Sequence, residues 1–321
     1  MVYFVVSDIH SFAKQLKESL RSAGFNKRNK NHTLIVCGDI FDRGSETLDV
    51  YKYIMSIPKR RRILVRGNHE DLYEELLSKT FPESHDYSNH TVDTFCHIAG
   101  YNPEILSSSY WYKLGEESPY ERIHQAWAEI KQLVAEHPIT AWLRSDEWLN
   151  YYELDKYIFV HSFIPLKNED GLPGYYVDYR HFSYLKNWRT KATATEWFDS
   201  RWGCPWKNYF QGLFEEEEKK GKVLVCGHWV VTDFREHLDC DFSDDTSIYY
   251  SDHLIGLDCG VWKYKYSKEY YHPQNVLVID SKDFNTCYDQ NHIKLVYYKA
   301  EPHTIIETVS EGDINVNEND L

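Results

Sequence analysis

The sequence predicts an α/β fold in which buried strands alternate with helices. Five apolar runs rich in Val and Ile each stop abruptly in a cluster of polar residues. Runs of this length and composition are typical of strands that are buried on both faces of a sheet. Helical patterns separate the first three runs, which indicates βαβ units. The five runs lie at 2–10, 33–44, 62–71, 157–162 and 222–229.

The remaining elements extend this pattern along the chain. Amphipathic stretches predict helices in the first part of the chain, at 12–25, 45–57 and 70–79. Further apolar runs predict strands near its other end, at 254–260, 275–281 and 293–299. Because ligands of open α/β sheets bind where loops leave the carboxyl ends of the strands, we expect all five polar clusters along one edge.

We expect a single domain over residues 1–309 with two insertions. The first, at about 80–150, is predicted to be mostly helical because 123–137 has the apolar periodicity of an amphipathic helix. The second, at about 166–220, is rich in aromatic residues, which either line a substrate groove or form the core of the insertion. We favour the core because aromatic side chains are more often buried. The acidic tail 310–321 is expected to be disordered.

Composition and charge narrow the classes of function. The 321 residues carry a formal net charge of -14, so broad electrostatic binding to nucleic acid is not expected. The seven cysteines include no CxxC pair and are expected to be buried thiols in a reducing compartment. No apolar run has the length of a signal or membrane segment. These observations predict a cytoplasmic protein without membrane contacts or stable nucleic-acid binding.

The polar clusters at the five strand ends share the same residue types. Their candidate ligands are Asp8, His10, Asp39, Asn68, His161 and His228. Mixed nitrogen and oxygen ligands without thiolates suit catalytic Mn²⁺, Fe or Zn²⁺, and six ligands are too many for one ion with an open position. Two ions that share a carboxylate fit better, as in two-metal sites for phosphoryl transfer. Aspartate also favours helix starts, but that preference does not explain five clusters with the same ligand types.

At these positions the sequence resembles the calcineurin-like metallophosphoesterases. The motifs SDIH, GDIFDRG, GNHE, VHS and CGH appear in the order and approximate spacing of that family. The full GDxxDRG motif, followed by GNHE and a single GH, is similar to the phosphoprotein phosphatase branch, which includes protein serine/threonine phosphatases and bacteriophage lambda phosphatase. The resemblance implies a mixed β-sandwich flanked by helices, the four-layer αββα fold, here with helical and aromatic-rich insertions.

The resemblance also implies which residues hold the metal ions. One ion would be held by Asp8 and His10, and Asp39 would bridge both ions. The ligands of the second ion would be Asn68, His161 and His228. The two divalent ions are expected to be Mn²⁺, with Fe, Zn²⁺, Ni²⁺ and Mg²⁺ as alternatives. Asp258, in LDCG, matches a DTG motif of the family.

Four residues are implied to act on the substrate. Arg43 would grip the phosphoryl oxygens, because a planar guanidinium can bond two oxygens at once, and Asn68 would contact the same group. His69 would be the general acid that protonates the leaving oxygen. Asp42 would bond the other nitrogen of His69 and so fix its tautomer and favour the cation.

One further residue and two departures concern the wall of the substrate site. A second phosphate-binding arginine is expected in the insertion after the fourth motif; Arg201, in WFDSRWG, is the first candidate and Arg189 the second. Ser11 stands where the family usually has glycine, and the stretch VHSF, which contains Ser162, replaces the family's VHAG. We therefore expect the metal site to follow the family more closely than the substrate wall does.

Together these residues predict a metal-dependent phosphoesterase that hydrolyses phosphomonoesters through a metal-bridging hydroxide. The leading prediction is a protein serine/threonine phosphatase whose partner is a phosphorylated protein or a small phosphate ester. One alternative is a hydrolase of dinucleoside polyphosphates or other nucleotides, or a phosphodiesterase. Another is a noncatalytic binding module of the same fold, which the intact set of ligands and acid-base residues argues against.

Overall fold

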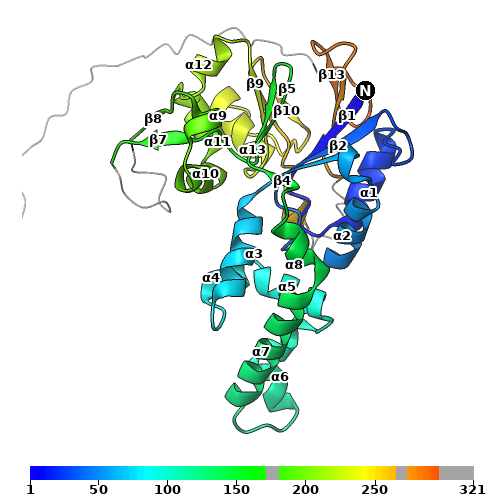
Figure 1. Cartoon of the computed structure of the whole chain (residues 1–321), viewed down its shortest axis with the longest axis vertical. Coiled ribbons are helices and arrows are strands. Elements are labelled where there is room, and N and C mark those ends of the chain that lie inside the picture. Colours follow the sequence, from blue (N-terminus) through cyan, green and yellow to red (C-terminus); the bar gives the residue numbers. More distant parts are fainter. Residues whose placement is uncertain (171–180, 265–272, 296–321) are drawn as a thin grey trace, which may run out of the picture.

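The computed structural model describes residues 1–170, 181–264 and 273–295. Two main sheets lie within these residues, and helices lie on their outer sides (Figure 1). A small third sheet pairs β7 (Leu166–Asn168) with β8 (Phe182–Tyr184) in the second insertion. The expected acidic tail at 310–321 lies outside the described residues.

The first sheet carries three of the five polar clusters. Its strand order is β13-β12-β1-β2-β3-β4. The strands are β1 (Val2–Val6), β2 (His32–Cys37), β3 (Arg62–Val65), β4 (Trp148–Leu149), β12 (Leu277–Asp280) and β13 (Cys287–Tyr288). Strands β1 to β4 run parallel, with Val5 opposite Ile35 and Ile35 opposite Ile63. The loops after β1, β2 and β3 therefore leave the sheet at the same edge.

The second sheet carries the other two clusters. Its strand order is β10-β11-β9-β6-β5. The strands are β5 (Tyr152–Leu154), β6 (Tyr157–Phe159), β9 (Val223–Cys226), β10 (Tyr249–Tyr250) and β11 (Leu254–Gly256). Strands β6, β9 and β11 run parallel, and β5 and β10 pair antiparallel to them.

The helices fall into three groups along the chain. After β1, β2 and β3 come α1 (Ala13–Ser22), α2 (Thr47–Met55) and α3 (Asn68–Ser78). The first insertion holds α4 (Ser84–Ser88), α5 (Thr91–Ala99), α6 (Ser108–Lys113), α7 (Tyr120–Glu136) and α8 (Pro138–Leu143). The rest are α9 (Trp188–Lys191), α10 (Ala194–Arg201), α11 (Pro205–Phe210), α12 (Glu215–Glu218) and α13 (Val231–Phe234). In Figure 1, α6 and α7 extend away from the sheets as an arm, and α8 lies nearer to them.

Side-chain alternation along the strands builds four layers. Val5 and Phe159 lie in a core between the two sheets. The next residue, Val6, points the opposite way into a core shared with α1, α2, α5 and α7. On the other side Ile158 packs with Trp188 of α9 and Phe234 of α13. The order helix, sheet, sheet, helix confirms the predicted αββα fold class.

Two predictions about strands need correction. The five polar clusters do not lie along the edge of one sheet, because β6 and β9 pair with each other and not with the first sheet. The apolar pattern of a buried strand does not specify its neighbour, so the sequence alone merges the two sheets. The strand expected at 293–299 is reduced, within its described part, to a bridge between Lys294 and Tyr288, and residues 296–299 lie outside the description.

None of the helices within the described residues combines the length and the apolar character needed to cross a bilayer.

Candidate metal centre and active site

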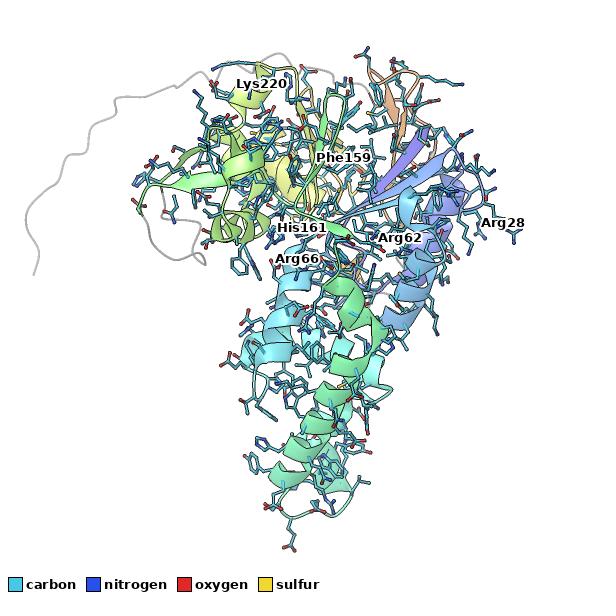
Figure 2. All side chains as sticks on the ribbon, viewed as in Figure 1. Arg28, Arg62, Arg66, Phe159, His161 and Lys220 are labelled. Carbon is cyan, nitrogen blue, oxygen red and sulfur yellow. The ribbon has the colours of Figure 1, made fainter. Side chains whose placement is uncertain are left out.

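The polar clusters of both sheets meet where the parallel strands end. Figure 2 shows His161 at the junction between the sheets and the helical arm. Short backbone hydrogen bonds join the loops: Asp8 N–H donates to the Gly38 carbonyl over 3.2 Å, and Gly227 N–H donates to the His161 carbonyl over 2.7 Å. The His228 N–H donates to the Asp8 carboxylate over 3.0 Å. The two sheets thus bring together all six predicted ligands.

The backbone at these strand ends is strained. Six of the predicted site residues adopt positive φ, namely Asp8 (51°), His10 (48°), Asp39 (55°), Asp42 (71°), Arg43 (61°) and His228 (69°). Non-glycine residues rarely adopt this left-handed conformation, which costs about 1–3 kcal/mol each and concentrates at functional sites. The surrounding fold therefore holds these side chains in orientations that ordinary loops would not choose.

Two clusters of potential ligand atoms share the carboxylate of Asp39. In the first, His10 Nε2 lies 3.8 Å from Asp39 Oδ2 and 4.0 Å from Asp8 Oδ1. In the second, His161 Nε2 lies 3.4 Å from Asp39 Oδ1 and 3.2 Å from His228 Nδ1. Asp39 thus presents one oxygen to each cluster, as a carboxylate shared by two ions would.

Hydrogen bonds to backbone carbonyls orient the buried imidazoles as ligands. His161 Nδ1 lies 2.9 Å from the Cys37 carbonyl oxygen, and His10 Nδ1 lies 3.0 Å from that of Phe41. Each Nδ1–H therefore donates outward and leaves Nε2 with a lone pair that faces the cluster. His161 Nε2 lies 2.7 Å from Asn68 Oδ1, a second acceptor. The lone pairs of two acceptor atoms this close repel one another unless a cation lies between them. This set of ligand atoms therefore fits a divalent metal ion.

Burial makes the charges of this cluster unfavourable without a cation. Burial and then the nearby Asp258 carboxylate raise the pKa of Asp8. Burial followed by Asp8 and Glu70 raises the pKa of Asp39. Burial lowers the pKa of His161 to about 3, which keeps this imidazole neutral and available as a ligand. Divalent ions would balance the carboxylates and coordinate the neutral imidazoles.

Glu70 is a structural support that sequence reasoning left without a role. Its carboxylate accepts N–H groups from Asp39 at 3.0 Å, Ile40 at 2.9 Å and Gly67 at 2.7 Å. These bonds tie the loop after β2 to the start of α3. Glu70 therefore fixes the backbone that carries the shared carboxylate.

A histidine and an aspartate form a buried pair beside the metal ligands. His69 Nδ1 lies 2.6 Å from Asp42 Oδ2, the contact predicted for the general acid. The Asp42 carboxylate also accepts hydroxyl hydrogen bonds from Thr91 at 2.8 Å and Thr94 at 2.6 Å. Burial raises the pKa of Asp42 to about 6, and the two threonine hydrogen bonds oppose that shift. Burial, followed by the charge of Arg43, lowers the pKa of His69.

Arg43 lies between this pair and an aromatic side chain. Its guanidinium nitrogen NH2 is 3.3 Å from His69 Nε2. On the other side the guanidinium lies 4.1 Å from the ring centre of Trp262, within cation–π distance. Trp262 was not predicted, because no motif marks it. Stacking on this ring holds Arg43 over the metal ligands.

A cavity of about 210 Å³ opens over these groups. Its described lining consists of His10, Asp39, Arg43, Asn68, His69, His228, Trp229, Val230, Asp233, Asp258, Trp262 and Lys263. Four of the six predicted ligands belong to this lining, whereas Asp8 and His161 lie outside it. Trp229 is 37% exposed at the cavity. The cationic side chains of Arg43 and Lys263 line the cavity together with the carboxyl groups of Asp39, Asp233 and Asp258.

The two candidate arginines of the second insertion lie outside this described lining. Arg201 Nε bonds Asp71 over 2.5 Å, and one of its terminal nitrogens bonds Asn150 over 3.2 Å, yet its charge still contributes to lowering the pKa of His161. Arg189 pairs with Glu153 at 2.7 Å and Glu217 at 2.9 Å. Of the two arginines, Arg201 is therefore the one whose charge acts on a predicted site residue, His161.

The two serine departures are accommodated by hydrogen bonds. Ser11 adopts a φ of 61°, and its hydroxyl lies 3.0 Å from that of Thr47. The Ser162 hydroxyl donates to the Gly203 carbonyl over 2.7 Å. Both side chains are buried, and neither belongs to the described lining of the cavity.

Gly227 gives a first testable prediction. A Cβ at this position would overlap the Asp8 carboxylate and the Ser7 side chain. Gly227→Ala is therefore expected to lower the free energy of unfolding by about 1–3 kcal/mol and to weaken metal binding, because Asp8 must move. Thermal melts and metal titrations measure both effects. Gly100→Ala is the control: alanine is strained at its φ of +80°, but the added Cβ meets no atom within 4 Å. Unchanged metal affinity in Gly227→Ala would contradict the proposed role of Asp8.

Fold and site together define a phosphoesterase. The family model of the calcineurin-like phosphoesterases matches residues 1–255, and the chain belongs to this family.

Among curated proteins, it is similar to the symmetrical bis(5'-nucleosyl)-tetraphosphatase of Buchnera aphidicola subsp. Schizaphis graminum, with 39% identity over 69 residues. This match spans 22% of the chain and 24% of that protein. Among solved structures it is similar to a cold-active protein-tyrosine phosphatase of Shewanella, with 11% identity, a TM-score of 0.49 and coverage of 92% of this chain and 79% of that one. A protein serine/threonine phosphatase from Saccharomyces cerevisiae matches at 12% identity and a TM-score of 0.41, over 80% and 67% of the two chains.

Proposed function

We propose that the protein is a binuclear metal-dependent phosphatase that hydrolyses phosphomonoesters. The observation that carries the proposal is the position of Asp39, which offers one oxygen to each of two ligand clusters. One ion would be held by Asp8, His10 and Asp39, and the other by Asp39, Asn68, His161 and His228. Two divalent ions, Mn²⁺ in our proposal, would activate a water nucleophile and neutralise charge on the phosphoryl oxygens.

The other side chains bind the phosphoryl group and move a proton. Arg43, stacked on Trp262, bonds two phosphoryl oxygens through its guanidinium. When the phosphoryl group of a substrate binds Arg43, the guanidinium moves away from His69 Nε2. This nitrogen then faces the leaving oxygen. His69 donates a proton to the departing alkoxide, and Asp42 holds the opposite Nδ1–H and stabilises the imidazolium.

The size of the cavity supports a phosphorylated protein as substrate. Its volume of about 210 Å³ is below the roughly 300–1,000 Å³ that encloses drug-sized ligands. Such a space suits a phosphoryl group and the side chain that carries it, while the rest of the substrate lies outside. We therefore propose a protein serine/threonine phosphatase, with small phosphate esters as further substrates.

A second candidate is a hydrolase of dinucleoside polyphosphates. The Buchnera relative carries this activity in its name. In addition, Trp229 and Trp262 at the cavity offer flat rings for a nucleobase, and Lys263 offers a further cation for a phosphate chain. This candidate shares the metal centre and differs in what lies beyond the first phosphoryl group.

A substrate panel tests the proposal and the role of the metal together. The purified chain is assayed on p-nitrophenyl phosphate, phosphoserine and phosphothreonine peptides, a dinucleoside tetraphosphate and a cyclic nucleotide, with Mn²⁺, Mg²⁺, Ni²⁺ or Zn²⁺ and after chelation. We expect turnover of the aryl phosphate and the peptides with Mn²⁺, and its loss after chelation. Turnover of the tetraphosphate without turnover of peptides would replace the first candidate by the second. Absence of turnover on every ester would support a binding module.

A further inference from the structure

We propose that Thr91 and Thr94 of the first insertion are positioning residues for the hydrolysis. They set the geometry of the acid, His69, and of the loop after β2, which carries Arg43. Both belong to α5, some 50 residues away in sequence from the loop after β2. The inference rests on the proposed function, because it assumes that His69 donates the proton. It adds that the geometry of this acid is not set by the strand-end motifs alone but needs a helix of the first insertion.

Three donors share the carboxylate of Asp42. Oδ2 accepts His69 Nδ1–H over 2.6 Å and the Thr91 hydroxyl over 2.8 Å, and Oδ1 accepts the Thr94 hydroxyl over 2.6 Å. All three contacts are buried. A carboxylate held at both oxygens cannot rotate about its terminal bond, so the direction of its bond to His69 is fixed. The imidazole is oriented by Asp42, and Asp42 is oriented by the two threonines.

Thr94 has a second contact that Thr91 lacks. Its hydroxyl oxygen also accepts the backbone N–H of Asp42 over 3.1 Å. A hydroxyl can donate and accept at once, so Thr94 holds both the main chain and the side chain of Asp42. Asp42 and Arg43 both adopt positive φ, at 71° and 61°, and such a conformation persists only where neighbouring groups enforce it. Thr94 therefore constrains the backbone that carries Arg43. Through Asp42 it also constrains the acid, His69.

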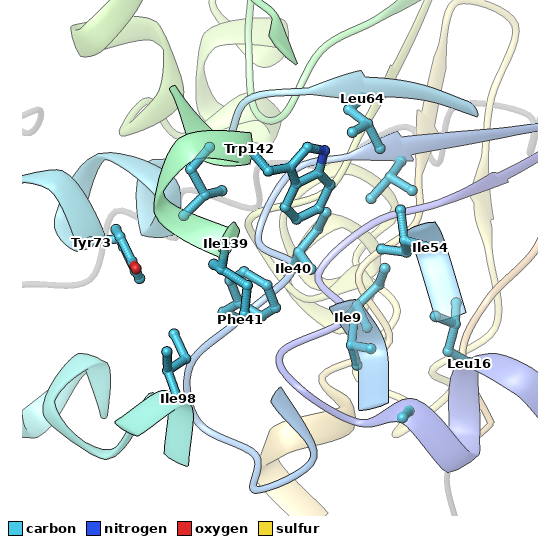
Figure 3. Close-up of a cluster of buried hydrophobic side chains, with 14 of the residues drawn as sticks. Ile9, Leu16, Ile40, Phe41, Ile54, Leu64, Tyr73, Ile98, Ile139 and Trp142 are labelled. Carbon is cyan, nitrogen blue, oxygen red and sulfur yellow. The ribbon is translucent and has the colours of Figure 1, made fainter. Parts of the chain in front are cut away.

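Apolar packing docks α5 against the same loop. Ile40 and Phe41, which directly precede Asp42, belong to one buried cluster with Ile98 of α5 and Ile139 of α8 (Figure 3). Asp42 lies at the first turn of α5, where the helix dipole also favours a carboxylate. The first insertion is thus packed onto the loop after β2 and is not attached to the rest of the fold only at its ends.

These contacts predict different kinetic effects for the two residues. Thr91→Val removes one hydrogen bond to Asp42 and is expected to lower kcat about tenfold on an alkyl phosphate, with little change in KM. Thr94→Val should lower kcat similarly and also raise KM several-fold, because the Arg43 backbone loses its support. The losses in kcat should shrink on p-nitrophenyl phosphate, whose leaving group needs little protonation, whereas the rise in KM of Thr94→Val should remain. Thr91→Ser and Thr94→Ser keep the hydroxyl and should restore the rates.

The control is Thr140→Val in α8. The Thr140 hydroxyl is also buried and bonds the Val134 carbonyl at 2.6 Å and the Tyr73 hydroxyl at 2.6 Å; neither partner belongs to the loop after β2. This variant should lose stability while keeping kcat and KM. Thermal melts of every variant separate unfolding from loss of catalysis, and Thr91→Ala and Thr94→Ala replace any valine variant that does not fold.

A double-mutant cycle completes the test. In a His69→Asn background, Thr91→Val should have no further effect on kcat, because it acts through His69. Folded threonine variants with wild-type rates on alkyl phosphates, or an undiminished tenfold loss in the His69→Asn background, would overturn the inference while leaving the proposed function in place. Wild-type protein without metal-dependent turnover of any phosphate ester would instead overturn the proposed function, and this inference with it.

Discussion

Asp39→Asn is expected to abolish hydrolysis of p-nitrophenyl phosphate, with a loss of at least about 10³-fold in kcat. The substituted amide can still accept the His69 backbone N–H, which lies 3.0 Å from Asp39 Oδ1. It cannot present an oxygen to both clusters, because its NH₂ group would face His10 Nε2 where Oδ2 now lies at 3.8 Å. The change removes one negative charge and one shared ligand while leaving side-chain volume almost unchanged.

Metal content and melting temperature decide how this result is interpreted. We expect Asp39→Asn to bind fewer than two metal ions per chain by elemental analysis while remaining folded. Glu217→Gln is the matched control, since Glu217 is also fully buried but pairs with Arg189 in the second insertion at 2.9 Å. That control should lose stability and keep its activity per folded molecule. Wild-type turnover in Asp39→Asn would exclude the shared-carboxylate mechanism.

That the candidate ligands lie close together could be predicted because they stand at strand ends. Asp8, Asp39 and Asn68 each follow the end of an apolar strand by two or three residues, so the position of each strand places its candidate ligand. The sequence does not state which strands are neighbours, and His161 was assigned to the same edge as Asn68 although it follows a strand of the other sheet. The ligands nevertheless meet, because the ends of both sheets converge.

The supporting residues could not be predicted, because their contacts are long-range and their types are common. Thr91 and Thr94 reach Asp42 across 49 and 52 residues, and threonine on a helix carries no pattern that indicates a catalytic contact. Trp262 could equally be a core residue by its type. The two candidate arginines had the same ambiguity, and the structure shows that both form ion pairs, Arg189 with Glu153 and Glu217 and Arg201 with Asp71. Short elements such as β4 and β10, with two residues each, are too brief to give a periodic signal.

His69→Asn is expected to lower kcat about 10²–10⁴-fold on alkyl phosphates, because a departing alkoxide is a poor leaving group unless it is protonated. Asparagine cannot donate an acidic proton, although it can still bond the Asp42 carboxylate that His69 Nδ1 approaches to 2.6 Å. The metal ligands are retained, so metal content should stay near that of the wild type. With p-nitrophenyl phosphate the loss should be much smaller, since that leaving group is stable as an anion.

Plotting log kcat against the pKa of the leaving alcohol measures this effect directly. The wild-type slope should be shallow, because His69 supplies the proton, and the His69→Asn slope should be steep and negative. His97→Asn is the control for histidine loss, since His97 lies on α5 but outside the described lining of the cavity. Its slope should match that of the wild type. Parallel slopes for the wild type and His69→Asn would assign His69 to binding or to metal support, because a residue that gives no proton cannot change the dependence on the leaving group.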